Sequence, residues 1–370
     1  MTPSAAVAAV AAVDAVRDAV AAGPFVHVAG GATKGALADG ATLTTSSLVG
    51  VLEYDPLEFT FTALAGTPVR EIDALLARHG QYLPFDPPWA EAGATLGGTV
   101  ASGLSGPGRF RYGGVRDFLL GVRFVNGDGA VVTGGGKVVK NAAGFDFPKL
   151  MVGSLGRFGV LVEVTFKVFP RPRAHATLEF TVDGLRAGVE ALHALATASL
   201  ELACLEYDPP GRLLVRVAGS AEGLAGRLER VRAKQGGACT AHHDQDDAAL
   251  WRSEREFEWL PAGYALAKVA LSPTSVLEFD GELARQGLFG PRRYGVGGNV
   301  GYVTCADERE RRALDGVLRT LGRAGLALTS SWDAPLLGVH RGGAFQERIR
   351  SVLDPGGTFA LRAGGVVDAA

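Results

Sequence analysis

Glycine is concentrated in one stretch of this 370-residue chain. Of its 52 glycines, 18 lie between Gly93 and Gly159, a stretch of 67 residues. Glycine costs a helix or strand interior roughly 0.5–1 kcal/mol relative to alanine, so this density predicts tight turns and places where bare backbone approaches a ligand or another segment. Runs typical of strands (118–126, 130–133 and 160–169) alternate with the glycines, and Asn126-Gly127-Asp128-Gly129 is a strong hairpin signal.

Strand-like and helix-like segments are mixed along the chain, which predicts an α+β fold. Before the glycine cluster we expect strands over 25–29, 44–53 and 60–64, and a helix over 68–79 that has Thr67 as N-cap, Pro68 as its first residue and Gly80 after its end. After Pro170-Arg171-Pro172 glycine clusters become rare. Strand-like runs (176–182, 212–217, 265–271, 300–305) then alternate with helical ones (185–198, 221–235, 308–324).

These patterns predict two domains. Residues 1–172 form the first, which begins with an amphipathic helix over 3–22 whose apolar side includes Val7, Val10, Val13 and Val20. Residues 173–370 form the second, an antiparallel sheet covered by helices.

Composition and charge exclude several classes of protein. The chain has 37 Lys and Arg against 39 Asp and Glu, a net charge of −2, which argues against a nucleic-acid binder. Its three cysteines, Cys204, Cys239 and Cys305, stand far apart, which excludes a disulfide scaffold, a thiolate zinc site and an iron–sulfur cluster held by this chain alone. No segment has the pattern of a signal peptide or a membrane span, so we expect a cytoplasmic protein.

A short loop after the first expected strand is suited to an anion. In Gly30-Gly31-Ala32-Thr33-Lys34 the small residues leave backbone N–H groups open, Thr33 adds a hydroxyl and Lys34 adds a positive charge, which together predict a diphosphate cradle. Taken alone, an ordinary loop remains the alternative. No G-x-G-x-x-G follows a strand, and the residues around Gly136-Lys137 lack the first glycine and the Ser or Thr of a phosphate-binding loop, so NAD and ATP are not favoured.

Two further segments extend this pattern. Every side chain from Gly97 to Gly103 is small or short, so a large planar ligand could lie against the backbone there. The run 153–163 is again a glycine-rich loop followed by a strand.

Read together, these segments resemble the FAD-binding domain of the vanillyl-alcohol oxidase (PCMH-type) flavoprotein superfamily, and within it the FAD-binding subunits of bacterial glycolate oxidases. The resemblance is carried by Leu83–Pro88, Ala94–Gly98, Leu104–Pro107, Tyr112–Asp117 and Gly135–Asp146. It is strong over residues 25–172 and faint beyond them. It implies a PCMH-type domain of two α+β subdomains, followed by a smaller α+β domain like the C-terminal domain of FAD-linked oxidases.

The resemblance also implies which residues contact FAD. They are Gly30, Gly31, Ala32, Thr33, Lys34, Pro87, Thr95, Leu96, Gly97, Gly98, Ala101, Ser102, Gly103, Ser105, Tyr112, Gly113, Val115, Gly159 and Val160. The chain departs from the family at Ala29, where relatives usually carry an arginine. Some relatives attach FAD through a histidine next to this loop, whereas Ala32 and Thr33 stand here, so we expect non-covalent FAD.

A metal site expected from the resemblance is missing. Many 2-hydroxy-acid relatives carry H-x-G-D-G-N-x-H, and the matching segment here is 294–301, in which Tyr294 and Gly301 replace both histidines and Gly297 replaces the acid. We therefore expect no metal. No catalytic residue is evident. The Arg292-Arg293 pair and His340 could face a substrate carboxylate or simply be solvated, and the run 251–259 favours core or interface.

The expected function is that of an FAD-binding subunit in a glycolate-oxidase-like complex that oxidises a small 2-hydroxy acid. A larger homologous FAD subunit would carry the substrate chemistry and an iron–sulfur subunit would take the electrons onward, with the complex cytoplasmic or held at the inner membrane by its partners. Two alternatives stay open. One is a stand-alone, metal-independent FAD oxidoreductase acting on an alcohol or hydroxy acid, which a buried base near the flavin would favour. The other is a non-catalytic accessory subunit without flavin.

Overall fold

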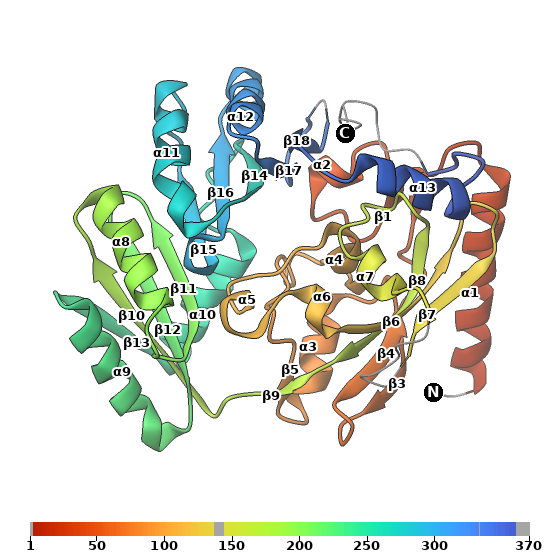
Figure 1. The fold of residues 1–370 in the computed structure, drawn as a ribbon. Helices are drawn as coiled ribbons and strands as arrows, with labels where there is room; N and C mark the ends of the chain where they lie inside the picture. Colours follow the sequence, from red (N-terminus) through yellow and green to blue (C-terminus); the bar gives the residue numbers. More distant parts are fainter. Residues whose placement is uncertain (1–2, 137–143, 333, 360–370) are drawn as a thin grey trace.

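The computed structural model describes residues 3–136, 144–332 and 334–359, which form two halves built on separate antiparallel sheets (Figure 1). The run Gly135–Asp146, which carries part of the resemblance, therefore lies in part, at 137–143, outside the described residues. None of the helices in these ranges is long and apolar enough to cross a membrane.

The first half is organised around a five-stranded sheet in the order β3-β4-β8-β6-β7. One face packs in a large core with Phe61, Phe124 and Phe166, and residues on the other side of the sheet pack on the N-terminal helix. The elements of this half are α1 (Pro3–Ala22), β1 (Val28–Ala29), α2 (Gly35–Ala38), β2 (Leu43–Thr44), β3 (Val51–Asp55), β4 (Thr60–Leu64), α3 (Val69–Ala77), β5 (Gln81–Tyr82), α4 (Leu96–Ser102), α5 (Arg109–Tyr112), α6 (Val115–Phe118), β6 (Leu119–Val125), β7 (Val131–Gly135), α7 (Phe147–Met151), β8 (Val160–Lys167) and β9 (Phe169–Pro170).

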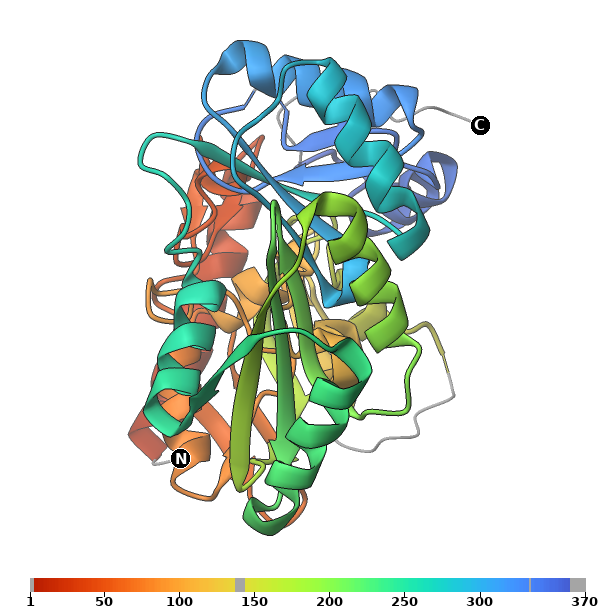
Figure 2. The same ribbon diagram turned by 90° about the vertical axis from the view of Figure 1, so that its left-hand side faces the viewer.

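The second half is organised around a nine-stranded sheet in the order β13-β10-β12-β11-β15-β16-β14-β17-β18. Helices α8 and α9 cover its outer face (Figure 2), where α8 packs on β11 and α9 packs on β10 and β12. Its elements are β10 (Ala174–Thr181), α8 (Gly184–Ala196), β11 (Leu202–Asp208), β12 (Arg212–Gly219), α9 (Ala221–Gln235), β13 (Cys239–His243), α10 (Asp244–Glu256), β14 (Ala265–Ala270), η1 (Pro273–Ser275), α11 (Val276–Arg285), β15 (Arg292–Gly295), η2 (Val296–Gly298), β16 (Val300–Cys305), α12 (Glu308–Thr320), β17 (Ala324–Ala327), β18 (Leu336–Gly338) and α13 (Gly343–Leu353).

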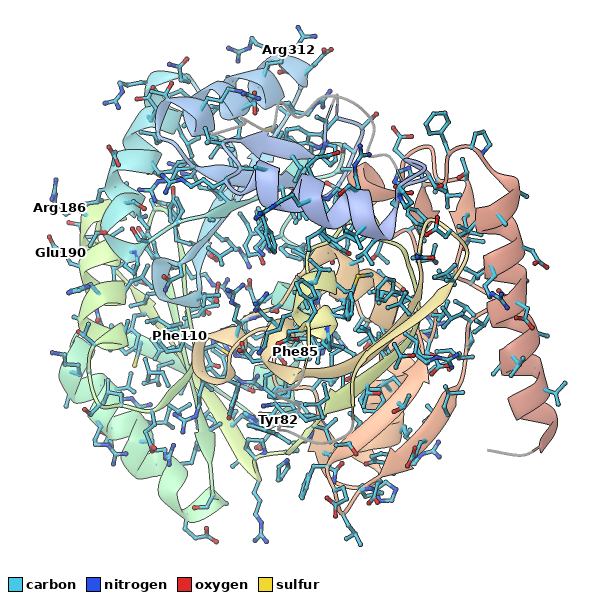
Figure 3. All side chains as sticks on the ribbon, turned by 45° about the vertical axis from the view of Figure 1, so that its right-hand side comes forward. Tyr82, Phe85, Phe110, Arg186, Glu190 and Arg312 are labelled. Carbon is cyan, nitrogen blue, oxygen red and sulfur yellow. The ribbon has the colours of Figure 1, made fainter. Side chains whose placement is uncertain are left out.

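The two halves share a packed contact. Leu266, Val300 and Tyr302, on the inner face of the second sheet, belong to the hydrophobic core of the first half. In return Phe110 projects from α5 towards the second half (Figure 3) and packs against Gly297. The space between the two sheets is therefore lined by residues of both halves.

The C-terminal helix α13 returns to the first half and lies beside it (Figure 1). The backbone N–H of Gly127, in the β6–β7 hairpin, donates to Leu353 O at 2.8 Å. The Asp354 carboxylate accepts the N–H groups of Thr358 and Phe359 at 2.7 and 2.9 Å. This carboxylate orders the turn after α13. In the same turn the carbonyl oxygen of Thr358 accepts the N–H of Val26.

The α+β fold with antiparallel sheets is confirmed, and α1, β4, α9, β16 and the hairpin at Asn126–Gly129 lie where the sequence predicts them. The second domain was expected to be the smaller one, whereas its sheet, with nine strands, is larger than the five-stranded sheet of the first half. That residues 1–172 and 173–370 fold as separate domains stays a prediction.

Five local predictions were wrong. Thr67 does not cap α3, because its hydroxyl instead bridges the N–H and C=O of Gly50, and Pro68 is the N-cap. The strand expected over 25–29 shortens to β1, and the run 44–53 is interrupted before β3 begins. The helix expected over 308–324 ends at Thr320, before Gly322 with its φ of 60°. On α1 the buried valines are Val13, Val16 and Val20, whereas Val7 and Val10 are exposed.

The contact between the turn after α13 and the β6–β7 hairpin predicts the effect of adding one methyl group at Gly127. A Cβ at Gly127 would overlap the Asp354 carboxylate, so Gly127→Ala should lower the midpoint of thermal unfolding, at a cost of about 1–3 kcal/mol for an overpacked site. Gly316→Ala, on the exposed face of α12 with open space around its Cβ position, should raise the midpoint by removing a helix glycine worth about 0.5–1 kcal/mol. Equal midpoints for the two variants would contradict this account of the contact.

Candidate functional site

A cavity lies beside β1, between the loop that follows it, α2 and α4. It encloses about 780 Å³, counted with its open mouth, which is within the usual range for small-molecule sites. Its walls are formed by His27, Val28, Ala29, Gly30, Gly31, Ala32, Thr33, Lys34, Ala36, Leu37, Ala38, Asp39, Thr95, Gly98, Ala101, Ser102, Leu155, Trp332 and Pro335. We call it the β1 cavity.

Two glycines allow the loop to lie directly on the start of α4. A Cβ at Gly30 would overlap the hydroxyl of Thr95, and a Cβ at Gly31 would overlap the carbonyl oxygen of Gly93. Thr95 is the N-cap of α4, where its Oγ1 accepts the N–H of Gly98 at 3.2 Å. Only glycine fits at positions 30 and 31, so backbone rather than side chains forms this wall of the cavity.

Lys34 places a buried positive charge in the wall. Its side chain is 7% exposed, its Nζ donates to Thr33 Oγ1 at 3.0 Å, and the ammonium lies 5.5 Å from the centroid of the Trp89 ring. Burial lowers the pKa of Lys34 to about 8, although the negative charge of Glu256 acts in the opposite direction. Among the described residues no carboxylate forms an ion pair with it, so the site favours an anion supplied from outside the chain.

Nine of the residues predicted to contact FAD line the β1 cavity. They are Gly30, Gly31, Ala32, Thr33, Lys34, Thr95, Gly98, Ala101 and Ser102. The loop and the helix α4 are separated by 61 residues of sequence (35–95), and the fold brings them together as the resemblance implied.

The other predicted contacts lie elsewhere. The side chain of Leu96 is buried in the core of the first half, and Val160 packs in the core beneath α1. The hydroxyl of Ser105 accepts the N–H of Val115 at 2.9 Å, which ties the two segments to each other. Of the described residues predicted to bind FAD, those outside the β1 cavity are Pro87, Leu96, Gly97, Gly103, Ser105, Tyr112, Gly113, Val115, Gly159 and Val160, and their role stays a prediction.

The sequence did not point to several residues of the β1 cavity. Trp332 and Pro335 come from the second half, between β17 and β18, and no motif connects them with the loop at 30–34. Asp39 also lines the cavity, where its carboxylate accepts a hydrogen bond from Ser331 Oγ at 3.2 Å. His27 is a further wall residue, whose Nε2 lies 2.9 Å from Leu37 O.

A second, smaller cavity lies between the two halves. We call it the interlobe cavity. Its space for water-sized groups is about 20 Å³, which is enough for one water molecule. It is lined by Pro88, Gly106, Pro107, Glu206, Glu254, Arg255, Phe257, Trp259, Arg293, Val296 and Tyr302. Pro88 and the pair Gly106-Pro107 directly follow Pro87 and Ser105, two of the predicted FAD contacts.

The arginines considered for substrate binding are already paired with carboxylates. Arg292 forms an ion pair with Asp280. Arg293 pairs with Asp208 and Glu254 and lies over the Trp259 ring, 4.5 Å from its centroid. His340 Nε2 lies within 3.1 Å of two backbone carbonyl oxygens. None of the three is an exposed cation, and their role in substrate binding stays a prediction.

The segment 294–301 contains no His, Cys, Asp or Glu side chain. The Tyr294 hydroxyl is bound to Asp280 on the helix-covered side of the sheet, and the glycines at 297 and 298 have positive φ. Within the described ranges no group of three or more His, Cys, Asp and Glu side chains is arranged to hold a metal ion.

Comparison with known proteins finds a family match in the first half. Residues 5–135, about a third of the chain, match the family model described as FAD binding domain. This segment is similar to the FAD-binding domains of that family.

Curated relatives include subunits of glycolate oxidases. Glycolate oxidase subunit GlcE of Escherichia coli is 50% identical over 139 residues, which are 38% of this chain and 40% of that protein. Glycolate oxidase subunit GlcD of Bacillus subtilis is 28% identical over 252 residues, which are 62% of this chain and 52% of that protein. The matched segments thus span about half or less of these relatives. The chain is homologous to glycolate oxidase subunits.

The same fold occurs in a solved structure of alkyldihydroxyacetonephosphate synthase. It aligns with a TM-score of 0.68 at 16% identity, over 94% of this chain and 74% of that one. At this identity the match shows the fold alone.

The β1 cavity fits the diphosphate of FAD. Glycines without room for a Cβ leave the backbone of the 30–34 loop at the wall, and a buried ammonium without a carboxylate partner among the described residues lies beside them. A diphosphate supplies the negative charge that this ammonium lacks.

The glycine wall predicts a selective loss of FAD binding. Gly31→Ala must displace the loop from Gly93, so we expect its dissociation constant for FAD to rise at least tenfold while thermal unfolding stays cooperative. Gly35→Ala, in α2 of the same wall segment, has its nearest contact at an ordinary 3.7 Å and should bind FAD as the parent chain does. Flavin fluorescence titration measures both. Unchanged FAD affinity in Gly31→Ala would show that the loop is not part of the site.

Proposed function

We propose that the chain is the FAD-binding subunit of a glycolate-oxidase-like complex that oxidises a small 2-hydroxy acid. The observation that carries the proposal is the buried Lys34 in the glycine wall of the β1 cavity, inside the segment that matches the FAD-binding family. Homology to two different glycolate oxidase subunits supports the reaction class and the assembly with other subunits.

In this proposal the residues of the first half hold the cofactor. Gly30, Gly31 and Thr33 present backbone N–H groups and a hydroxyl to the diphosphate, and Lys34 neutralises part of its charge. Asp39, which lines the same cavity, would accept hydrogen bonds from hydroxyl groups of the cofactor. When bound, FAD supplies the two-electron acceptor for oxidation of an alcohol.

The complex would contain a larger homologous FAD subunit and an iron–sulfur subunit, located in the cytoplasm or at the inner membrane through these partners. The chain has no cluster-binding cysteine pattern of its own, so electrons that leave its flavin one at a time need a partner's centre. Co-purification of the three subunits, followed by transfer of electrons from glycolate to the iron–sulfur centre, tests this assembly.

Non-covalent attachment has a direct test. Ala32 and Thr33 offer no nucleophile suited to bond the flavin ring, and His27 Nε2 is engaged with Leu37 O. Acid precipitation of the purified yellow protein should therefore leave all of the flavin absorbance in the supernatant. Flavin that stays in the washed pellet would refute non-covalent binding.

The pKa of Lys34 predicts how FAD affinity depends on pH. In the free protein Lys34 loses its proton around pH 8, whereas the bound diphosphate favours the charged form and raises that pKa. Affinity should therefore be constant below pH 8 and fall by up to tenfold per unit above it, until the pKa of the complex is reached. Calorimetric titration between pH 6 and 10 measures this.

Two variants isolate the contribution of Lys34 from those of Glu256, His27 and Asp39, which lie near it. Lys34→Met should bind FAD at least tenfold more weakly at pH 7 and lose the fall in affinity above pH 8. Lys234→Met, on the exposed side of α9, removes the same charge far from the cavity. This variant should bind FAD as the parent chain does and should keep the fall in affinity above pH 8. The same pH profile in Lys34→Met and in the parent chain would contradict the role of Lys34.

A further inference from the structure

Glu206 is a buried carboxyl group that the binding site described so far does not use. It lies on β11, in the inner face of the second sheet, and is 6% exposed. Its Oε1 accepts the N–H of Val296 at 2.9 Å. Among the described residues no hydrogen bond reaches its Oε2, although the side chain lines the interlobe cavity.

The backbone opposite Glu206 is shaped to receive it. A Cβ at Gly295 would overlap Oε2 of Glu206, so the carboxyl group lies directly on a main chain without a side chain. The carboxyl is therefore fixed in position by the turn at 295–296 instead of being free to rotate into solvent. A fixed position is what a proton-transfer group needs, because the transfer requires hydrogen-bond contact with the reacting atom.

The far wall of the interlobe cavity belongs to the FAD-binding half. Pro88, Gly106 and Pro107 form it. Pro88 and Gly106 directly follow the predicted FAD contacts Pro87 and Ser105, and Pro107 follows Gly106. The cavity has room for one water molecule, which is also the size of a hydroxyl group. Arg255 lines the same space, and its buried Nε has no hydrogen-bond partner within the described part of the chain.

We propose that Glu206 is the general base that takes the hydroxyl proton of the substrate during FAD-dependent oxidation on this chain. The inference rests on the proposed FAD site, and it assigns the oxidation of the hydroxy acid to this subunit without a metal ion. The hydroxyl group enters the interlobe cavity, where its O–H donates to Glu206 and its oxygen accepts from Arg255 Nε. The remainder of the substrate lies towards Pro88, Gly106 and Pro107, on the side of the FAD-binding half.

Atoms and electrons balance in this step. The O–H bond breaks and its proton moves to a carboxylate oxygen of Glu206. The C–H bond of the same carbon breaks with its electron pair, and hydrogen with two electrons passes to the oxidised flavin, which is the oxidant. The carbon–oxygen bond becomes a double bond, so the hydroxy acid leaves as an oxo acid and Glu206 is left as a neutral carboxyl group.

The surroundings of Glu206 set the pH range in which it acts. Burial, reinforced by the charge of Asp208, raises the pKa of Glu206 to about 8, against the opposing hydrogen bond from Val296 and the charge of Arg293. The charged and titratable groups near it are Cys204 and Asp208 on β11, Arg293 on β15, Tyr302 on β16, and Glu254 and Arg255 on α10. Because a base acts in its ionised form, the rate should rise by up to tenfold per pH unit below pH 8 and level off above it.

The test uses the full chain loaded with FAD, and glycolate and D-lactate as probes. In anaerobic stopped-flow mixing, the rate of flavin bleaching should follow this pH profile in the parent protein. Glu206→Gln retains the acceptor for Val296 and should bind FAD normally, but reduce it at least 100-fold more slowly and without the rise towards pH 8. Glu163→Gln, a carboxyl of β8 that pairs with Arg123, is the control and should behave as the parent protein does.

A second measurement does not need FAD or turnover. Trp259 lines the same cavity, so its fluorescence in the FAD-free chain should titrate with a midpoint near pH 8. The titration should disappear in Glu206→Gln and in Trp259→Phe. It keeps the inference testable in the parent chain even if Glu206→Gln does not fold.

The outcomes separate this inference from the proposed function. A chain that binds no FAD refutes the proposed function, while the Trp259 titration still decides whether Glu206 ionises in the cavity. A chain that binds FAD but is bleached by neither probe overturns the inference and leaves the cofactor site intact. Bleaching by Glu206→Gln at the parent rate, or a Trp259 titration that persists in that variant, also overturns it.

Discussion

The charge of Lys34 is the constraint on which the rest of the site depends. An ammonium removed from water is costly unless a negative charge accompanies it, and among the described residues this one contacts the Thr33 hydroxyl and the face of Trp89 without an ion pair to a carboxylate. The lowered pKa of Lys34 reflects the free-energy cost of burying its charge. A diphosphate held at the glycine wall would add to the negative charge of Glu256 and raise the pKa of Lys34 again.

The fold keeps this cation in place through contacts between the two halves. The carboxylate of Glu256, at the end of α10, accepts the N–H groups of Glu91 and Ala92 at 3.1 and 3.2 Å, and Trp89 N–H donates to Arg255 O. The segment that carries Trp89 is thus fixed by a helix of the second half. The same helix contributes Glu254 and Arg255 to the interlobe cavity, so the cofactor site and the inferred proton-transfer site share one structural support.

Much of the fold and part of the site could be predicted from the sequence, because local chemistry determines them. The hairpin at Asn126–Gly129 follows from its turn residues, and the cradle at Gly30–Lys34 follows from small residues beside a cation. The role of Thr67 could not be predicted in this way, since a bridge to the backbone of Gly50 depends on a neighbour 17 residues away. Likewise, which valines of α1 are buried depends on the sheet against which the helix packs.

Glu206 shows the same limit in the second half. In the run Leu202–Asp208 it is one acidic residue in a strand, and nothing in its neighbours distinguishes it from a solvated side chain. Its significance comes from the turn at 295–296 and from prolines of the other half, none of which is near it in sequence. The proposed role of Glu206 as the base of a metal-independent oxidation therefore could not be predicted from the sequence, because it depends on how the two halves pack together.

The central claim, that the loop at 30–34 holds the diphosphate of FAD, is tested most directly by a crystal structure of the chain with FAD bound. The account predicts phosphate oxygens within hydrogen-bond distance of Lys34 Nζ and of backbone N–H groups between Gly30 and Thr33. A bound flavin whose phosphates lie elsewhere, with Lys34 still packed only on Thr33 and Trp89, would contradict it.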